Sequence, residues 1–320
     1  MATTHHPEEA PTLQARGTAR AYAVPAARRH PWRQVLQTIG KHLLVGGVGL
    51  IFVFPVIWMF LASTRTDAEI FQWPPEIIPH HWTWSNYSDA FSFGNPGCTL
   101  LTCNFARYTR NTVIIAGFNV IGTLISCSLS AYAFARVNWR GRGFVFLIVL
   151  STMLLPYPVT LIPVYIIFKN LNMIGTSGIL FGYGPLIVPA FFGNAFFIFL
   201  LRQFFMTIPR ELDEAALIDG AGHLGIFTRV ILPLSRPALA VVALLTFLNN
   251  WTDLFGPMIY LNDTSLYTLS LGLQEFRGAH TFHWSLLMAA SVLFILPIVI
   301  LFVIAQRTFI QGITMTGLKG

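Results

Sequence analysis

The chain has 320 residues, of which 54% are hydrophobic and only 10% are charged, and its formal net charge is +7. Soluble domains carry about 25% charged residues, so this composition excludes an ordinary soluble domain and indicates a membrane protein. The basic residues lie beside apolar segments rather than on a polar domain, so the positive charge does not indicate nucleic-acid binding. Three cysteines are too few for a disulfide-rich scaffold.

The first 39 residues are polar and irregular, and most of their charges are basic. They predict a disordered, basic cytoplasmic tail. The pair Arg28 and Arg29 resembles a twin-arginine signal, but the apolar segment that follows is long and lacks a small-residue cleavage site. We therefore expect this segment to be an uncleaved anchor.

Six apolar segments follow, and each has roughly the 20 residues that a membrane-spanning helix needs. The predicted spans are 41–62, 111–135, 143–168, 180–203, 237–260 and 285–306. The predicted fold class is therefore an all-α polytopic membrane protein, with a six-span domain at 40–310 and a cytoplasmic C-terminal tail at 311–320. Prolines interrupt the third and fourth spans at Pro156, Pro158, Pro163, Pro185 and Pro189. Broken spans of this kind can mark a transport pathway, or they can be simple kinks in a packed bundle.

The basic residues predict how the chain crosses the membrane. With the N-terminus inside, 15 of the 20 lysines and arginines fall in the inner segments. Inner loops carry an excess of basic residues, so both termini and the polar loop at 204–236 are expected in the cytoplasm.

Two outer segments contain further features. The loop at 63–110 is rich in tryptophan and proline, which predicts an interfacial segment. It also contains Cys98 and Cys103, which could form a disulfide on an oxidising outer face or remain two reduced thiols. Cys127, in the second span, is expected to be a small core residue.

Polar residues stand near the end of the fifth span: Asn249, Asn250, Trp251 and Asp253. They are interpreted either as a gate or pathway element near the outer mouth, or as the end of a helix at headgroup level.

The polar stretch from Ile208 to Pro237 is the one long polar segment in the second half of the chain. It predicts a short helix that Thr207 caps, with Pro209 in the first turn. Glu211, Asp213 and Glu214 would lie at its start, where the helix dipole favours carboxylates.

Gly220 and Gly222 predict a break or a surface of close approach at the end of this helix. Leu212, Ala216 and Gly220 recur every four residues, and such a face would suit docking into a groove of another protein. The alternative is a solvated amphipathic helix without a partner.

Glu214-Ala215-Ala216 is followed after three residues by Gly220, after nine more by Val230, and after one more by Leu232-Pro233. This spacing resembles the EAA loop of ABC importer permeases. The longer pattern that starts at Pro209 resembles the carbohydrate, maltose-type (MalG-like) branch of binding-protein-dependent transporters. The resemblance covers about residues 40–320; Val230 stands where the family prefers isoleucine. It implies that the loop is a coupling helix seated in an ATPase subunit. The matching positions, with the flanking acids, are Glu211, Glu214, Ala215, Ala216, Asp219, Gly220, Leu232 and Pro233.

The resemblance further implies a permease subunit that carries a sugar or sugar derivative across the bacterial cell membrane. The implied partners are a second homologous permease, an ATP-binding cassette ATPase dimer and an extracytoplasmic binding protein, which the outer loop at 261–284 would face. ATP and Mg would be bound by the ATPase, and no cofactor by this chain. Consistently, the sequence contains no phosphate-binding G-x-x-x-x-G-K-[ST] loop.

No pattern predicts catalysis or metal binding. The histidine pairs His5–His6 and His80–His81 lack a carboxylate or cysteine at ligand spacing. The alternative function is a secondary transporter driven by an ion gradient, which would require charges at mid-depth in the spans or an inverted repeat. The spans contain almost no such charge, and no repeat is evident.

Overall fold

The computed structural model describes residues 31–317 except 75, 100, 176–178 and 279–281. Within these ranges the chain is helical with connecting loops, and the one β-feature is an isolated bridge between Arg277 and Phe282. The predicted all-α class is confirmed. The chain divides into two compact units, residues 1–54 and 55–320.

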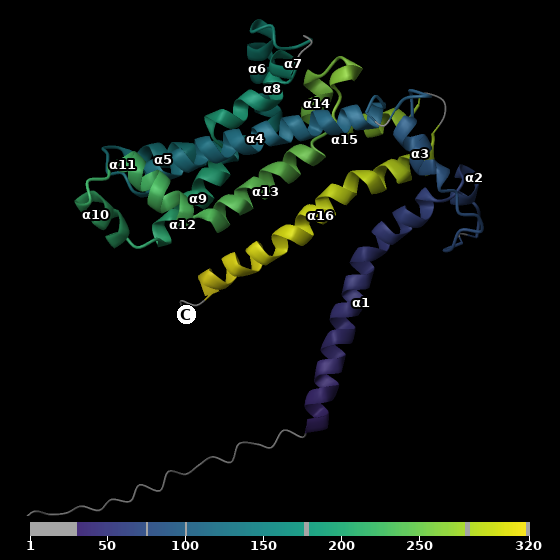
Figure 1. Cartoon of the computed structure of the whole chain (residues 1–320), viewed down its shortest axis with the longest axis horizontal. Coiled ribbons are helices and arrows are strands. Elements are labelled where there is room, and N and C mark those ends of the chain that lie inside the picture. Colours follow the sequence, from purple (N-terminus) through teal and green to yellow (C-terminus); the bar gives the residue numbers. More distant parts are fainter. Residues whose placement is uncertain (1–30, 75, 100, 176–178, 279–281, 318–320) are drawn as a thin grey trace, which may run out of the picture. The chain divides into compact units, whose positions relative to one another are not determined.

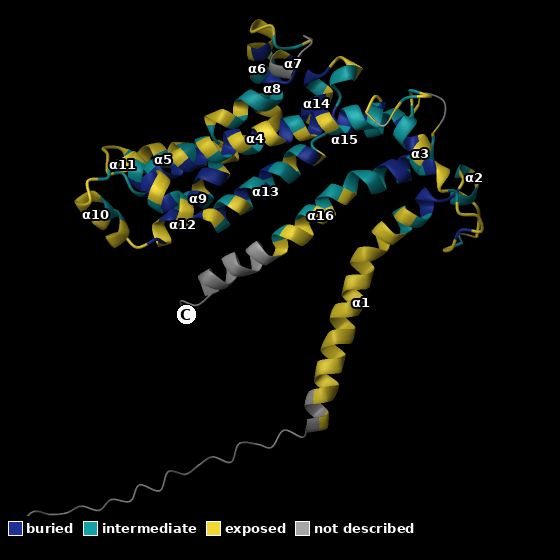
Figure 2. Ribbon diagram, in the orientation of Figure 1, coloured by how far each residue is buried: buried dark blue, intermediate teal, exposed yellow. Residues whose placement is uncertain are grey.

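The described part of the first unit is the beginning of α1 (Pro31–Ser63). Every described side chain from Trp32 to Phe54 is exposed (Figure 2). An apolar helix with this much exposed surface is suited to lipid or to a second apolar protein surface. Residues 1–30 of the expected tail lie outside the described residues, whereas 31–39 form the first turns of α1 rather than part of a tail.

The core of the second unit lies between α4 (Asn104–Ala135), α9 (Ala195–Thr207) and α13 (Arg236–Thr252). Its centre is formed by Cys127, Ala131, Leu201 and Val242, which are fully buried. Helix association in a membrane depends on close packing, and the small side chains of α4 allow it. The expectation that Cys127 is a core residue is confirmed.

Aromatic and alanine side chains attach α16 (Trp284–Gly317) to this core and to the short helix α3 (Ser85–Ser92). The indole nitrogen of Trp251 donates to the Phe294 carbonyl over 3.0 Å. Ala289 and Ala290 are fully buried and pack in one cluster with Ala90 of α3.

Four helices are long and apolar enough to cross a membrane: Val35–Ser63, Asn104–Ala135, Gly184–Thr207 and Trp284–Gln306. These agree with the first, second, fourth and sixth predicted spans. The third predicted span is bent by 100° between Arg142–Leu154 and Tyr157–Asn170. Proline disfavours helical backbone at the preceding residue, and Leu155 before Pro156 is extended with ψ 118.

The fifth predicted span ends earlier than expected. Helix α13 stops at Thr252 because Asp253 adopts an extended conformation, and residues to 260 form a separate helix, α14 (Phe255–Tyr260). At its other end α13 meets His223–Leu234 at a bend of 78°. The described helices therefore give four spans, or up to six if each bent pair is one span.

The remaining elements are short helices along the chain (Figure 1): α2 (Asp67–Ile70), α5 (Arg142–Ser151), η1 (Thr152–Leu154), α6 (Tyr157–Asn170), α7 (Ile179–Gly182), α8 (Gly184–Ile187), η2 (Val188–Phe192), α10 (Glu211–Ile218), α11 (His223–Ile226), η3 (Phe227–Ile231), α12 (Leu232–Leu234), η4 (Thr264–Leu266), α15 (Leu269–Gly272) and η5 (Leu273–Phe276). At one end of α4 lie α10, α11 and the start of α5, and at its other end lie α14 and α15 (Figure 1).

Candidate functional site: a clamped polar loop and a cavity between spans

The polar loop at 204–236 contains the predicted short helix, but that helix starts later than expected. Helix α10 begins at Glu211 after Arg210, so the expected cap at Thr207 is wrong. Thr207 is the last residue of α9, and its hydroxyl donates to the Phe204 carbonyl over 2.7 Å. The predicted placement of acids is confirmed, because Glu211, Asp213 and Glu214 all lie in the first turn of α10.

The end of α10 is a Schellman motif built on Gly220. Gly220 has φ +81, its N–H donates to the Leu217 carbonyl at 3.0 Å, and the N–H of Ala221 donates to the Ala216 carbonyl at 2.9 Å. A left-handed φ strains any residue with a Cβ, which explains glycine here. The predicted break is confirmed, whereas the predicted face of Leu212, Ala216 and Gly220 is wrong at Gly220, which lies beyond the helix.

Arg136 at the end of α4 attaches this loop to the spans. Its guanidinium donates to the Asp213 carboxylate over 3.1 Å and also to the carbonyls of Phe205 and Ile208. Only 4% of the Arg136 side chain and 16% of the Asp213 side chain are exposed. One buried cation thus fixes the ends of α4 and α9 to the first turn of α10. We call these contacts of Arg136 the Arg136 clamp. Asp213, which was expected to be a capping or docking charge, is part of this clamp.

The predicted coupling residues divide into an outer and an inner group. Ala216 and Leu232 are partly buried and pack against the core of α4, α9 and α13. The outer group is exposed and comprises Glu211, Glu214, Ala215, Asp219, Gly220 and Pro233.

Two apolar side chains that the sequence analysis did not select lie next to the outer group. Leu217 is 51% exposed and Ile218 is 87% exposed. Together with the acids they give α10 a mixed acidic and apolar outer surface. Such a surface, rimmed by polar groups, is typical of a protein interaction site. The signal that could have identified them is the Leu217–Ile218 pair itself, which ends α10 directly before the polar residue Asp219.

A polar cavity lies between α4, α13 and the broken fourth span. Its volume is about 300 Å³, at the lower limit of small-molecule sites. It is lined mainly by small and amide side chains: Asn119, Thr123, Pro189, Ala190, Gly193, Asn194, Phe197, Thr246, Asn249 and Asn250.

Some polar groups that line this cavity can still form hydrogen bonds with a ligand. Thr246 is buried, and its hydroxyl has no hydrogen-bond partner among the described residues. The amide nitrogen of Asn119 donates to the Ile115 and Leu186 carbonyls, and that of Asn250 donates to the Thr246 carbonyl. Within the described part of the chain, the amide oxygen of neither side chain accepts a hydrogen bond, so both oxygens can accept one from a ligand. The site can therefore exchange hydrogen bonds with a neutral polyhydroxy ligand.

The fourth span is interrupted where it lines the cavity. Helical structure stops at Gly193, which has φ +91, and α9 begins after Asn194, whose side-chain oxygen accepts from the N–H groups of Phe196 and Phe197. Backbone of this kind is tolerated at membrane depth where it lines a cavity. For this span, the interpretation as a pathway element is favoured over a simple kink.

The four polar residues predicted near the end of the fifth span lie in different environments. Asn249 and Asn250 line the cavity. Trp251 is buried and packs in parallel with Phe247. Asp253 is the C-cap of α13, and its carboxylate accepts from the Gly256 N–H over 3.2 Å. The helix-end interpretation therefore fits Asp253, and the pathway interpretation fits the two asparagines. Sequence reasoning missed Asn119, Asn194 and Thr246.

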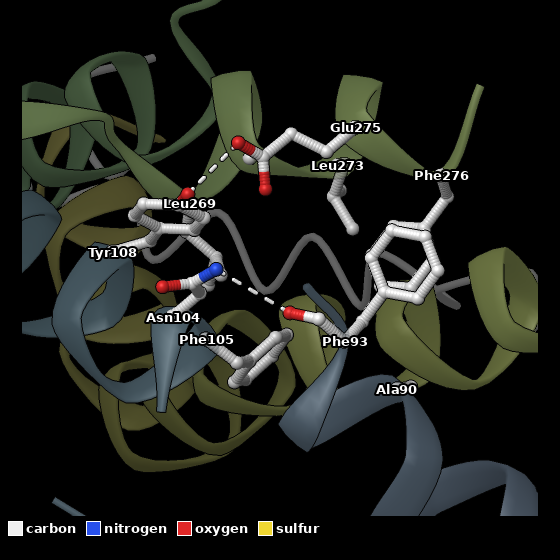
Figure 3. Close-up of a pocket in the computed structure, with 10 residues that line it drawn as sticks. Ala90, Phe93, Asn104, Phe105, Tyr108, Leu269, Leu273, Glu275 and Phe276 are labelled. Carbon is white, nitrogen blue, oxygen red and sulfur yellow. Dashed lines mark hydrogen bonds between the residues drawn. The ribbon is translucent and has the colours of Figure 1, made fainter. Parts of the chain in front are cut away.

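The opposite end of α4 holds a second, much smaller cavity of about 10 Å³ (Figure 3). There the Tyr108 hydroxyl donates to Glu275 over 2.9 Å and the Asn104 amide donates to the Phe93 carbonyl. This volume accommodates about one water molecule, so the cavity is not a sugar site.

Next to this end of α4, Cys98 and Cys103 form a disulfide. In the neighbouring loop, the Ser265 N–H donates to Asp263 and lowers the pKa of that carboxyl. Among the described residues no group of three or more metal-ligating side chains gathers.

Comparison with known proteins agrees with these features. The family model described as "Binding-protein-dependent transport system inner membrane component" matches residues 119–315. The arabinooligosaccharides transport system permease protein AraQ of Halalkalibacterium halodurans is 33% identical over 85% of this chain and 93% of its own. The sn-glycerol-3-phosphate transport system permease protein UgpE of Rhizobium meliloti is 32% identical over 89% and 98%.

A solved structure is also similar. It is a chain of a bacterial ABC transporter involved in the import of the acidic polysaccharide alginate, with a TM-score of 0.70 and 26% identity over 86% of this chain and 97% of that chain. The match to the family model extends over more than half of the sequence and includes the clamped loop and both sides of the cavity. The chain therefore belongs to the inner membrane components of binding-protein-dependent transport systems.

Proposed function

We propose that this chain is a permease subunit of an ATP-driven ABC importer and that it moves a sugar or sugar derivative delivered by an extracytoplasmic binding protein. The observation that carries the proposal is the Arg136 clamp, which joins the exposed helix α10 to two of the helices around the polar cavity. A force applied to α10 would be transmitted to α4 and α9 rather than absorbed by a flexible loop.

The outer surface of α10 would bind the ATPase subunit. Its exposed apolar residues Leu217 and Ile218 provide area to bury, and Glu211, Glu214 and Asp219 provide charges that can select a partner. Closure of an ATPase dimer would then pull on this loop, and the free energy of ATP binding would shift the population of cavity-open and cavity-closed states.

The remaining partners follow from the exposed surface and the family. The apolar surface of α1 would contact lipid or a second homologous permease. ATP and Mg would be held by the ATPase, and no cofactor by this chain.

The sugar is inferred from the uncharged amide and hydroxyl lining of the cavity and from the substrates named for relatives such as AraQ.

A secondary transporter driven by an ion gradient is not supported. The chain belongs to a family of permease components that depend on a binding protein. The cavity lining contains no charged side chain, whereas ion-coupled transport requires a site for the ion.

Uptake by the reconstituted importer tests the proposal. The chain is co-purified with its partner subunits and placed in proteoliposomes that contain ATP, with binding protein and radiolabelled oligosaccharide outside. We expect uptake that needs both internal ATP and the binding protein. Uptake that persists without ATP and disappears with a protonophore would contradict the proposal.

A further inference from the structure

The turn between α4 and α5 forms a basic corner, defined here as residues 136–143. It contains Trp139 and Arg140, both exposed, and Gly141, whose φ of +83 allows the chain to turn into α5. Residues 138–143 line a shallow, open hollow of about 510 Å³. The clamp between Arg136 and Asp213 places this corner beside α10.

Arg140 and Arg142 of the corner, and Arg202 of α9 next to it, have no carboxylate partner among the described residues. The Arg142 guanidinium donates to the Val137 carbonyl over 3.1 Å and to the Asn138 side chain over 3.2 Å. Arg202 donates to the Phe134 carbonyl over 3.2 Å, and its guanidinium lies 4.3 Å from the Phe146 ring centroid. Arg140 makes no hydrogen bond or ion pair within the described chain.

Unlike Arg136, these three arginines have no neighbouring carboxylate among the described residues. Arg136 is neutralised by Asp213, whereas Arg142 and Arg202 are fixed only by neutral oxygen atoms and an aromatic ring. The first turn of α5 adds the positive end of a helix dipole. These arginines and the helix dipole give the corner a positive electrostatic potential that an anion could neutralise.

An apolar surface continues directly from the corner. Phe144 is 69% exposed, Leu147 61% and Ile148 49%, all on α5, and the Trp139 ring is 38% exposed. An exposed apolar helix with a tryptophan at its end is typical of a segment at the membrane interface. A soluble anion would use only the arginines, whereas a lipid would use both the arginines and the apolar surface.

We propose that the basic corner binds the headgroup phosphate of an anionic phospholipid, with the acyl chains along α5. Basic sites at the cytoplasmic ends of spans attract anionic headgroups. The inference goes beyond the proposed function and rests on it in one respect, namely that α10 and the adjacent corner lie on the ATPase side of the membrane. A lipid bound there would support the turn that holds Arg136 and, through it, α10.

Lipid retention by the full chain tests the proposal. The purified chain is exchanged into nanodiscs that contain equal amounts of phosphatidylglycerol and phosphatidylcholine, and the lipid that co-purifies after transfer to neutral detergent is measured by native mass spectrometry. We expect the wild-type chain to retain phosphatidylglycerol. Each arginine near a membrane surface favours an anionic lipid roughly fivefold, so Arg140→Gln/Arg142→Gln should reduce the preference by roughly 25-fold.

Single and matched variants separate this site from general charge. Arg140→Gln alone removes no hydrogen bond between described residues and should reduce the preference by roughly fivefold. Arg110→Gln/Lys169→Gln removes two exposed basic residues elsewhere on the spans and should retain the wild-type preference. Equal losses in the two double variants, or no loss in either, would overturn the proposal.

Two further outcomes distinguish a lipid site from a site for a soluble anion, and a failure of lipid binding from a failure of the proposed function. Displacement of phosphatidylglycerol by millimolar inorganic phosphate would identify a site for a soluble anion and contradict the lipid assignment. Lipid retention is measured without ATP or substrate, so its failure is separate from a failure of uptake. A chain that retains the lipid but supports no ATP-driven uptake would refute the proposed function alone.

Discussion

Arg136 is the residue on which the loop at 204–236 depends most. Replacing it with glutamine would leave the Asp213 carboxylate and the carbonyls of Phe205 and Ile208 without their donor. Breaking a buried ion pair costs about 3–5 kcal/mol. We therefore expect Arg136→Gln to lower the thermal unfolding midpoint strongly in detergent.

Two controls accompany this measurement. Asp213→Asn keeps an acceptor for Arg136 and should destabilise less, by about 1.5–3 kcal/mol. Arg229→Gln alters an exposed arginine of the same loop and should change stability by about 0.5 kcal/mol or less. If Arg136→Gln unfolded at the midpoint of Arg229→Gln, the clamp would contribute nothing.

The disulfide between Cys98 and Cys103 can be tested by labelling. A membrane-permeant maleimide should label neither thiol until reductant is added, because both sulfur atoms are bonded. The experiment uses Cys127→Ala, which removes the third, buried cysteine. Labelling of both residues before reduction would show that the native chain holds two thiols.

At the scale of elements, Asn194 holds the start of α9 next to the cavity. Its side-chain oxygen accepts from Phe196 N–H at 3.0 Å and from Phe197 N–H at 3.3 Å. Loss of an N-cap typically costs about 1 kcal/mol. We expect Asn194→Ala to lower stability by about that amount and to reduce uptake, and Asn194→Ser, which retains a cap, to do less of both. Equal behaviour of the two variants would argue against a role for the cap.

The sequence predicted elements whose signal is local. Hydropathy located four spans, prolines located the break before Tyr157, and the acids located the start of α10 within a few residues. The cavity and the clamp were not predictable in this way. Arg136 and Asp213 are 77 residues apart, and only the packing of α4 against α9 brings them together.

The same limit explains the errors at helix ends. Thr207 stands where a pattern allows a helix to begin, and the span predicted at 237–260 continues past Asp253, although a helix end at Asp253 is the alternative that fits. Thr207 ends α9 instead, and the extended conformation of Asp253 ends α13. The residue at which a helix begins or ends depends partly on tertiary contacts, which a local sequence pattern does not reveal.

At the scale of the whole molecule, the distribution of basic residues predicts which side of the membrane each loop faces. Gly222→Cys and Asn262→Cys, each introduced into a chain without its native cysteines, place single thiols at exposed positions. An impermeant maleimide added to intact cells should label Asn262→Cys and leave Gly222→Cys unlabelled until the cells are opened. The reverse pattern would invert the predicted orientation.

The central claim is that α10 and Gly220 form the contact with the ATPase, and Gly220 allows a direct test. In the free chain a Cβ at Gly220 meets no atom of the described residues within 4 Å, and φ +81 strains any side chain. Gly220→Ala and Gly220→Trp should therefore destabilise the free chain alike, by about 1–2 kcal/mol.

The decisive measurement is the affinity of the ATPase dimer for the full-length chain in nanodiscs, compared between these two variants at equal membrane abundance. Overpacking a tight contact costs about 1–3 kcal/mol, so Gly220→Trp should bind at least about fivefold more weakly than Gly220→Ala. Equal affinities for the two variants would contradict the assignment of this loop as the coupling element.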